Sequence, residues 1–258
     1  MLDLEGDMNM RRNWTRKELL LALDLYCRMP FGKLHQHNPE VMSIAQVIGR
    51  TPSAVAMKAC NFANLDPNLG RKGLSSVSKA DREIWNEFFE DSQAVAFEID
   101  DIWETKEVSD ATIKSIPQDA ETETLKQVKV RKVQQFFRSS LLVSYASKCA
   151  ISGLAIPGLL VASHIIPWSK NESRRADPTN GILLNSLYDK AFDKGYMTFD
   201  EKWQVCLASD LKSEISDNEF CKSLFAIEGQ DLGMPNRFLP DSVAMAYHRN
   251  NIFEKSYA

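Results

Sequence analysis

Apolar residues recur at helical spacing along the first third of the chain. Thr15 and Glu18, three residues apart, fit a capping box, so a helix is predicted to begin there. Pro39 fits the first turn of a second helix, and Gly49 fits its end. Two further helices are predicted after that glycine. The pattern therefore predicts a helical domain over residues 1–96.

The second and third predicted helices flank a tight turn that contains glycine, which is the pattern of a helix-turn-helix. In that motif the second helix enters the major groove of DNA, and its early polar residues read the bases. The residues expected to do so here are Arg50, Ser53, Lys58 and Asn61. A bundle that only packs or binds protein is the alternative, because residues 1–96 carry no net charge.

The chain from residue 125 to the end mixes helical and strand patterns. Apolar residues at intervals of three or four predict a helix over 127–146. Short apolar runs at 149–153 and 159–164 predict strands, and the second run ends at a polar Ser-His pair. A short helix and a closing strand are expected at 187–194 and 196–200. The fold class is therefore predicted to be α+β.

Charge is distributed unevenly along the chain. Residues 97–124 have a net charge of -7 and are interpreted as an acidic linker, whereas residues 125–175 have a net charge of +8. A local positive field binds phosphate even though the whole chain carries -4. The basic residues expected to contact DNA are Arg131, Lys132, Arg138, Arg174 and Arg175. A solvated helix face beside an acidic linker is the alternative interpretation.

Composition excludes several classes of protein. The 258 residues contain no apolar run of the ~18 residues that suggest a membrane helix. The first residues place acids before bases and have no apolar segment, unlike a signal peptide. The five cysteines are scattered without a CxxC pair, which argues against a disulfide framework or a zinc knuckle. A soluble cytoplasmic protein is expected.

Candidate chemistry lies between residues 149 and 200. His164 at a strand end has a side chain whose pKa lies near neutrality, so it could deprotonate water. Asp189 and Asp193 are four residues apart on one helical face and offer oxygen ligands to Mg²⁺ or Mn²⁺. Asn180 can orient an imidazole by hydrogen bonding. A base, a hard cation and phosphate-binding arginines are what phosphodiester hydrolysis requires.

Three spaced runs resemble the HNH endonuclease family: ASHIIPW at 162–168, DPTNGILL at 177–184 and YDKAFDKG at 188–195. QQFFR at 134–138 and CAISG at 149–153 resemble the segments that lead into this site in bacterial restriction-type members. WTRKE and GRTPSAV near the amino end are similar, more loosely, to a helical unit that often precedes such domains. The family's active site is a two-stranded hairpin followed by a helix around one metal ion (ββα-metal).

The resemblance implies that residues 125–258 form an HNH nuclease domain. It implies that His164 is the general base and that Asn180 orients this base and its loop. The third family position falls at Tyr188 or Asp189, and Asp189 is the better ligand because a phenol binds Mg²⁺ poorly. Ser163 stands where many members have a metal-binding aspartate.

The leading interpretation is a metal-dependent DNA endonuclease of restriction or defence type. With one active site per chain, cutting both strands would need a homodimer or two events. A non-catalytic DNA-binding protein with a degenerate HNH fold is the second interpretation, motivated by Ser163 and Tyr188. A protein-interaction module whose basic helix docks on acidic partners is the third.

Overall fold

The computed structural model describes residues 12–69, 76–107, 121–209, 211, 222 and 225–254. The fold is α+β, with helices and two small antiparallel sheets, as the sequence predicts. In chain order the elements are α1 (Arg16–Arg28), η1 (Phe31–Lys33), α2 (Pro39–Ile48), α3 (Pro52–Leu65), α4 (Lys79–Glu90), α5 (Ser92–Glu107), α6 (Glu121–Ser144), η2 (Pro157–Leu159), β1 (Leu160–His164), η3 (Pro178–Asn180), β2 (Gly181–Asn185), α7 (Ser186–Asp193), β3 (Met197–Phe199), β4 (Val205–Leu207) and α10 (Ser242–Asn251).

Helices α1 to α5 form a bundle whose ends match the predicted capping residues. Thr15 and Glu18 make a reciprocal capping box at α1, because each side chain accepts from the backbone N–H of the other. Gly49 ends α2 in the left-handed region with φ 63°, and Pro52 opens α3. The second and third predicted helices are therefore present and joined by a short turn, and their use as a DNA-binding helix-turn-helix remains a prediction.

A buried ion pair joins α3 to α4. Lys58 Nζ lies 2.9 Å from Asp81 Oδ1, and the Asp81 side chain is 0% exposed. The same carboxylate accepts from Asn61 Nδ2 and from the backbone N–H of Ser78. A carboxylate without water needs such a complete set of donors, so Asp81 fixes the geometry between the two helices.

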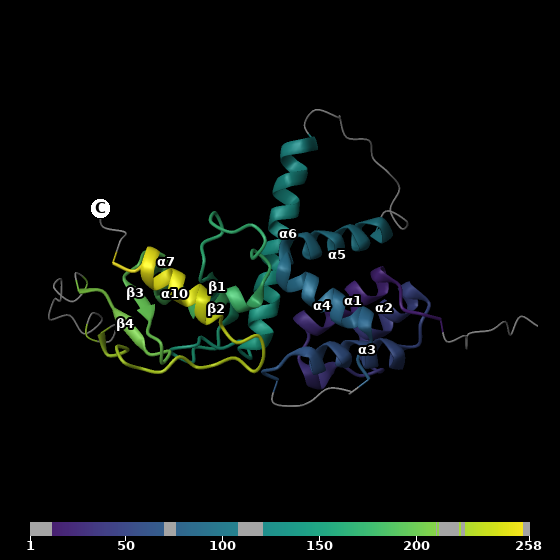
Figure 1. Cartoon of the computed structure of the whole chain (residues 1–258), viewed down its shortest axis with the longest axis horizontal. Helices are drawn as coiled ribbons and strands as arrows, with labels where there is room; N and C mark the ends of the chain where they lie inside the picture. Colours follow the sequence, from purple (N-terminus) through teal and green to yellow (C-terminus); the bar gives the residue numbers. More distant parts are fainter. Residues whose placement is uncertain are drawn as a thin grey trace, which may run out of the picture.

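Helix α6 runs between the bundle and the sheets (Figure 1). Phe136 packs beside Phe88 of α4, with ring centroids 5.9 Å apart, and so contacts the bundle core. Phe137, the next residue, belongs to the core of the β-containing half. Because successive residues of a helix point about 100° apart, one helix supplies side chains to both cores.

The predicted acidic linker begins too early. The structure places residues up to Glu107 in α5, which packs against α1 and α6. Asp100 and Glu104 of α5 both lie 2.7 Å from Lys132 Nζ of α6. Acidic and basic stretches that the sequence separates thus neutralise each other across two helices. Residues 108–120 of the predicted linker lie outside the described residues.

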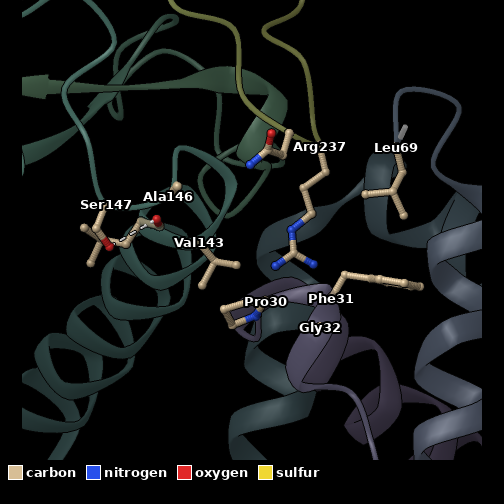
Figure 2. Close-up of a pocket in the computed structure, with 10 residues that line it drawn as sticks. Pro30, Phe31, Gly32, Leu69, Val143, Ala146, Ser147 and Arg237 are labelled. Carbon is tan, nitrogen blue, oxygen red and sulfur yellow. Dashed lines mark hydrogen bonds between the residues drawn. The ribbon is translucent and has the colours of Figure 1, made fainter. Parts of the chain in front are cut away.

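The C-terminal segment returns to the bundle near residue 237. Arg237 is 3% exposed and donates hydrogen bonds to the carbonyls of Tyr26 and Met29 at the end of α1. Figure 2 shows its guanidinium reaching Pro30 and Phe31, beside a cavity of about 570 Å³ between the two halves. Phe238 packs inside the bundle core. The two halves are therefore interlocked through a segment remote in sequence.

The β-containing half holds the β1–β2 hairpin, the β3–β4 hairpin and the helices α7 and α10. Both faces of β1–β2 are covered, because α6 and α7 each contact both strands. Within the described residues, no helix is long and apolar enough to cross a membrane.

Replacing Asp81 tests the importance of the buried pair. Asp81→Ala leaves the Lys58 ammonium buried without a counter-charge and removes the carboxylate that completes the capping box of α4. We expect a loss of about 3–5 kcal/mol in the free energy of unfolding, measured by urea denaturation. The exposed ion pair between Lys79 and Glu83 of the same helix provides the control. Glu83→Ala should change the free energy of unfolding by less than about 1 kcal/mol. Equal effects of the two changes would contradict this assignment.

Candidate active site

The register of the hairpin decides where each candidate side chain points. Strands β1 and β2 pair in an antiparallel manner, with His164 opposite Gly181 and Ser163 opposite Ile182. Successive side chains of a strand point to opposite faces, so His164 and Ser163 face different helices. A Cβ added at Gly181 would lie 2.5 Å from the Phe137 ring. His164 and Gly181 therefore face α6, and only glycine leaves room there for Phe137.

Two aromatic rings enclose His164. The Phe137 ring stacks on the imidazole with centroids 3.9 Å apart and an angle of 12°. The Trp168 ring meets it edge-on at 5.6 Å. Phe137 lies within the helix predicted over 127–146, but nothing in the apolar spacing of that helix shows that its ring contacts His164.

A backbone carbonyl determines which nitrogen of His164 carries the proton. Nε2 lies 3.0 Å from the carbonyl oxygen of Arg175. A carbonyl only accepts, so Nε2–H donates and Nδ1 is the nitrogen able to take a proton. Burial, assisted by the nearby Arg175 charge, lowers the pKa of His164 to about 4, and the hydrogen bond to the carbonyl opposes this shift. The imidazole is therefore neutral at pH 7.

Asn180 holds the loop that follows His164. Its side chain is buried, accepts from the backbone N–H of Ile166 at 2.9 Å and donates to the Ile166 carbonyl at 3.2 Å. Its own carbonyl accepts from the backbone N–H of Ile165 at 2.9 Å. Paired hydrogen bonds of this kind fix the chain as it leaves β1. The contacts of Asn180 are thus to the loop, while the imidazole is held by Arg175.

Asp189 lies on the other face of the hairpin. Burial raises the pKa of its carboxyl, a hydrogen bond from Ser163 lowers it, and the charge of Asp193 raises it. Asp193 is exposed one helical turn later on α7. Two carboxylates and a hydroxyl form a donor set of hard oxygens, which suits Mg²⁺ or Mn²⁺ with several waters retained. The residues present therefore fit a divalent cation.

Most of the predicted basic contacts are engaged within the protein. Arg174 pairs with Asp177 and Asp241, both at 2.8 Å. Arg138 donates to the carbonyls of Leu160 and Pro157. Lys132 forms an ion pair with Asp100 of α5. Arg175 donates hydrogen bonds to the Gln93 side chain and to the Trp168 carbonyl. Arg131 is exposed on α6. Contact of these five residues with DNA remains a prediction.

The predicted DNA-reading residues of the bundle also have internal partners. Arg50 pairs with Glu18 at 2.8 Å and lies over the Trp14 ring. Lys58 and Asn61 are buried against Asp81, whereas Ser53 is exposed at the start of α3. These contacts give Arg50, Lys58 and Asn61 structural roles, and base reading by the four residues remains a prediction.

His248 of α10 is a buried histidine outside the hairpin. Its Nδ1 lies 2.9 Å from Thr198 Oγ1, and its Nε2 lies 3.0 Å from the Phe192 carbonyl. The Phe192 ring stacks on it at 3.8 Å. Burial lowers its pKa to about 4. With both nitrogens engaged and 1% exposure, His248 ties α10 to α7 and β3.

Comparison with known families agrees with this geometry. Residues 149–200 match the family model HNH_2, described as HNH endonuclease. The matched segment contains β1, β2, α7 and β3, and includes His164, Asn180 and Asp189. No curated protein matches the chain. The match confirms the family resemblance of this segment and indicates nuclease activity in general.

The lowered pKa values of His164 and His248 predict a loss of stability in acid. Their pKa values are about 4 in the folded protein and near 6.5 in the unfolded chain, so the unfolded chain binds more protons between these values. The stability that these two neutral histidines contribute should therefore be fully present above pH 6.5, and the free energy of unfolding should fall as the pH drops towards 4. Urea denaturation over that range measures the slope.

His248→Gln should flatten this slope, whereas His35→Gln, at an exposed position in the loop after η1, should leave it unchanged. A slope that is identical in all three proteins would show that His248 is not held neutral.

Proposed function

We propose that this HNH-type chain is a metal-dependent DNA endonuclease of restriction or defence type, in which His164 is the general base. The observation that carries the proposal is the state of His164: neutral, enclosed by rings and held through Nε2, with Nδ1 left as the proton acceptor. A general base must be deprotonated and oriented before the substrate arrives. His248, the other histidine with a lowered pKa, has both ring nitrogens engaged in hydrogen bonds.

Asp189, Asp193 and Ser163 would hold the divalent cation. When bound, the cation supplies charge stabilisation to the phosphate oxygens and the leaving oxygen. Ser163 and His164 are consecutive, so their Cα atoms lie about 3.8 Å apart even though their side chains diverge. A phosphodiester lying across the end of β1 can therefore meet the base from one face of the hairpin and the carboxylates from the other. His164 then takes a proton from the attacking water.

DNA is proposed as the substrate because the family indicates a nuclease and Arg131 adds an exposed positive charge on the helix that carries Phe137. Most other predicted basic residues have internal partners. One site per chain cuts one strand in each event, so a double-strand break needs a second chain or a second event.

A non-catalytic DNA-binding protein is the second candidate. Ser163 contributes a neutral oxygen beside Asp189, so the donor set carries one charge fewer than it would with an aspartate at that position. Fewer charged ligands weaken the binding of a hard cation. In that case the chain would shift DNA in a gel in a salt-sensitive manner without cleaving it in any divalent metal.

Removal of the imidazole tests the catalytic assignment. His164→Ala should lower the rate of nicking of supercoiled plasmid with Mg²⁺ or Mn²⁺ by about 10²–10⁴-fold, the contribution typical of a general base. Circular dichroism and gel shifts should show the fold and DNA binding retained. The exposed His37→Ala variant is the matched control and should cut at the normal rate. Normal cleavage by His164→Ala would refute the role of this residue.

Neutralising Asp189 tests the cation site. Asp189→Asn keeps the shape of the side chain but removes the charge from the half-buried carboxylate beside Ser163. We expect Mn²⁺ binding, followed by isothermal titration calorimetry, to weaken by about 10-fold or more. Glu201→Gln, on the exposed turn after β3, should leave the titration unchanged. Equal Mn²⁺ affinity in Asp189→Asn and the parent protein would place the cation elsewhere.

A further inference from the structure

The first turn of α5 contacts the loop that holds His164. Ser92 is 0% exposed, and its Oγ donates to the Ser173 carbonyl at 2.8 Å and accepts from the Ala176 backbone N–H at 3.1 Å. The Ser92 backbone N–H also donates to the Ser173 carbonyl, at 2.8 Å. One residue of the helical bundle thus satisfies two backbone groups of the loop, on either side of residues 174 and 175.

Arg175 connects this contact to the imidazole. Its Nη1 donates to Gln93 Oε1 at 3.1 Å, and its Nε donates to the Trp168 carbonyl at 2.9 Å. The guanidinium carbon lies 4.7 Å from the centre of the Trp168 ring, whose edge faces His164. The Arg175 carbonyl is the acceptor for His164 Nε2. The Arg175 side chain therefore binds Gln93 of the bundle, while the Arg175 carbonyl binds His164.

A small apolar cluster reinforces the same contact. Ala96 of α5, Val133 of α6 and Ala176 of the loop are all buried together, and Trp168 packs against them. This cluster is separate from the two larger cores. The loop is therefore packed against the bundle by apolar contacts as well as hydrogen bonds.

We propose that Ser92 and Gln93 are positioning residues for His164, so that the helical bundle completes the nuclease site. This inference rests on the proposed function for its effect on cleavage. Ser92 fixes the backbone of residues 173–176, and Gln93 fixes the Arg175 side chain, so the Arg175 carbonyl stays directed at Nε2. Without the Ser92 hydroxyl the Ala176 backbone N–H loses its acceptor, and without the Gln93 amide the Arg175 side chain loses an acceptor. The Arg175 carbonyl is then no longer held in the direction that fixes the tautomer and orientation of the ring.

The test compares four variants of the full chain. Ser92→Ala removes the bridging hydroxyl, and Gln93→Leu removes the acceptor for Arg175 at a half-buried position, where the fold tolerates the change more readily. Gln93→Glu keeps an acceptor for Arg175 and should restore normal behaviour. Gln46→Leu, at an exposed position of α2 in the same bundle, is the matched control.

The first readout is the NMR signal of the His164 Nε2–H, recorded without DNA or metal and assigned by its loss in His164→Gln. We expect its exchange with water to rise at least 10-fold in Ser92→Ala and Gln93→Leu, and to stay slow in Gln93→Glu and Gln46→Leu. Slow exchange in both Ser92→Ala and Gln93→Leu would overturn the proposal, whether or not the chain cuts DNA.

The second readout is plasmid nicking. A misplaced base lowers turnover by up to about 100-fold without changing substrate binding, so we expect Gln93→Leu to lower kcat at least 10-fold at unchanged KM. Gln93→Glu should restore kcat. An unchanged kcat in an active Gln93→Leu protein would overturn the proposal. Failure of the parent protein to nick would refute the proposed function alone, because the exchange measurement remains decisive for the positioning of the ring.

Discussion

The alternation of side chains along β1 is the constraint on which the site depends. Because Ser163 and His164 occupy opposite faces of a two-stranded hairpin, both faces must be covered, and the fold covers them with α6 and α7. On the α6 face, Phe137 stacks on His164 and desolvation keeps the imidazole neutral. The α7 face gathers carboxylates beside a hydroxyl. A hairpin with only one packed face would expose one of these two environments to bulk water.

Local structure was predictable where the signal lies in neighbouring residues. Thr15 with Glu18 and the Gly49 turn mark helix ends correctly, and β1 and α7 lie where the apolar runs predict them. The strand predicted at 149–153 was wrong, because those residues form a turn closed by the hydrogen bond from the Gly153 N–H to the Cys149 carbonyl. The pairing of β1 with β2 agrees with the two-stranded hairpin that the family resemblance implies. The start of the linker was wrong, because α5 is stabilised by packing on α1 and α6, which its acidic composition does not indicate.

Partners of charged residues could not be predicted, because they are set by contacts between elements remote in sequence. Lys58 reads as an exposed cation on a recognition helix until Asp81, 23 residues later, is placed against it. Arg175 reads as a phosphate ligand until Gln93 and Trp168 surround it. A count of bases along the chain measures the charge available, whereas the folded protein determines how much of it reaches solvent.

Phe238 has a consequence for how the molecule is made. Its ring packs on Tyr26 and Trp85 inside the bundle, and its backbone N–H donates to Asp66, 172 residues earlier in the chain. On a ribosome, α1 to α4 emerge before this aromatic group and lack it until residue 238 has been synthesised. The helical bundle thus stays without a complete interior while most of the β-containing half is being translated.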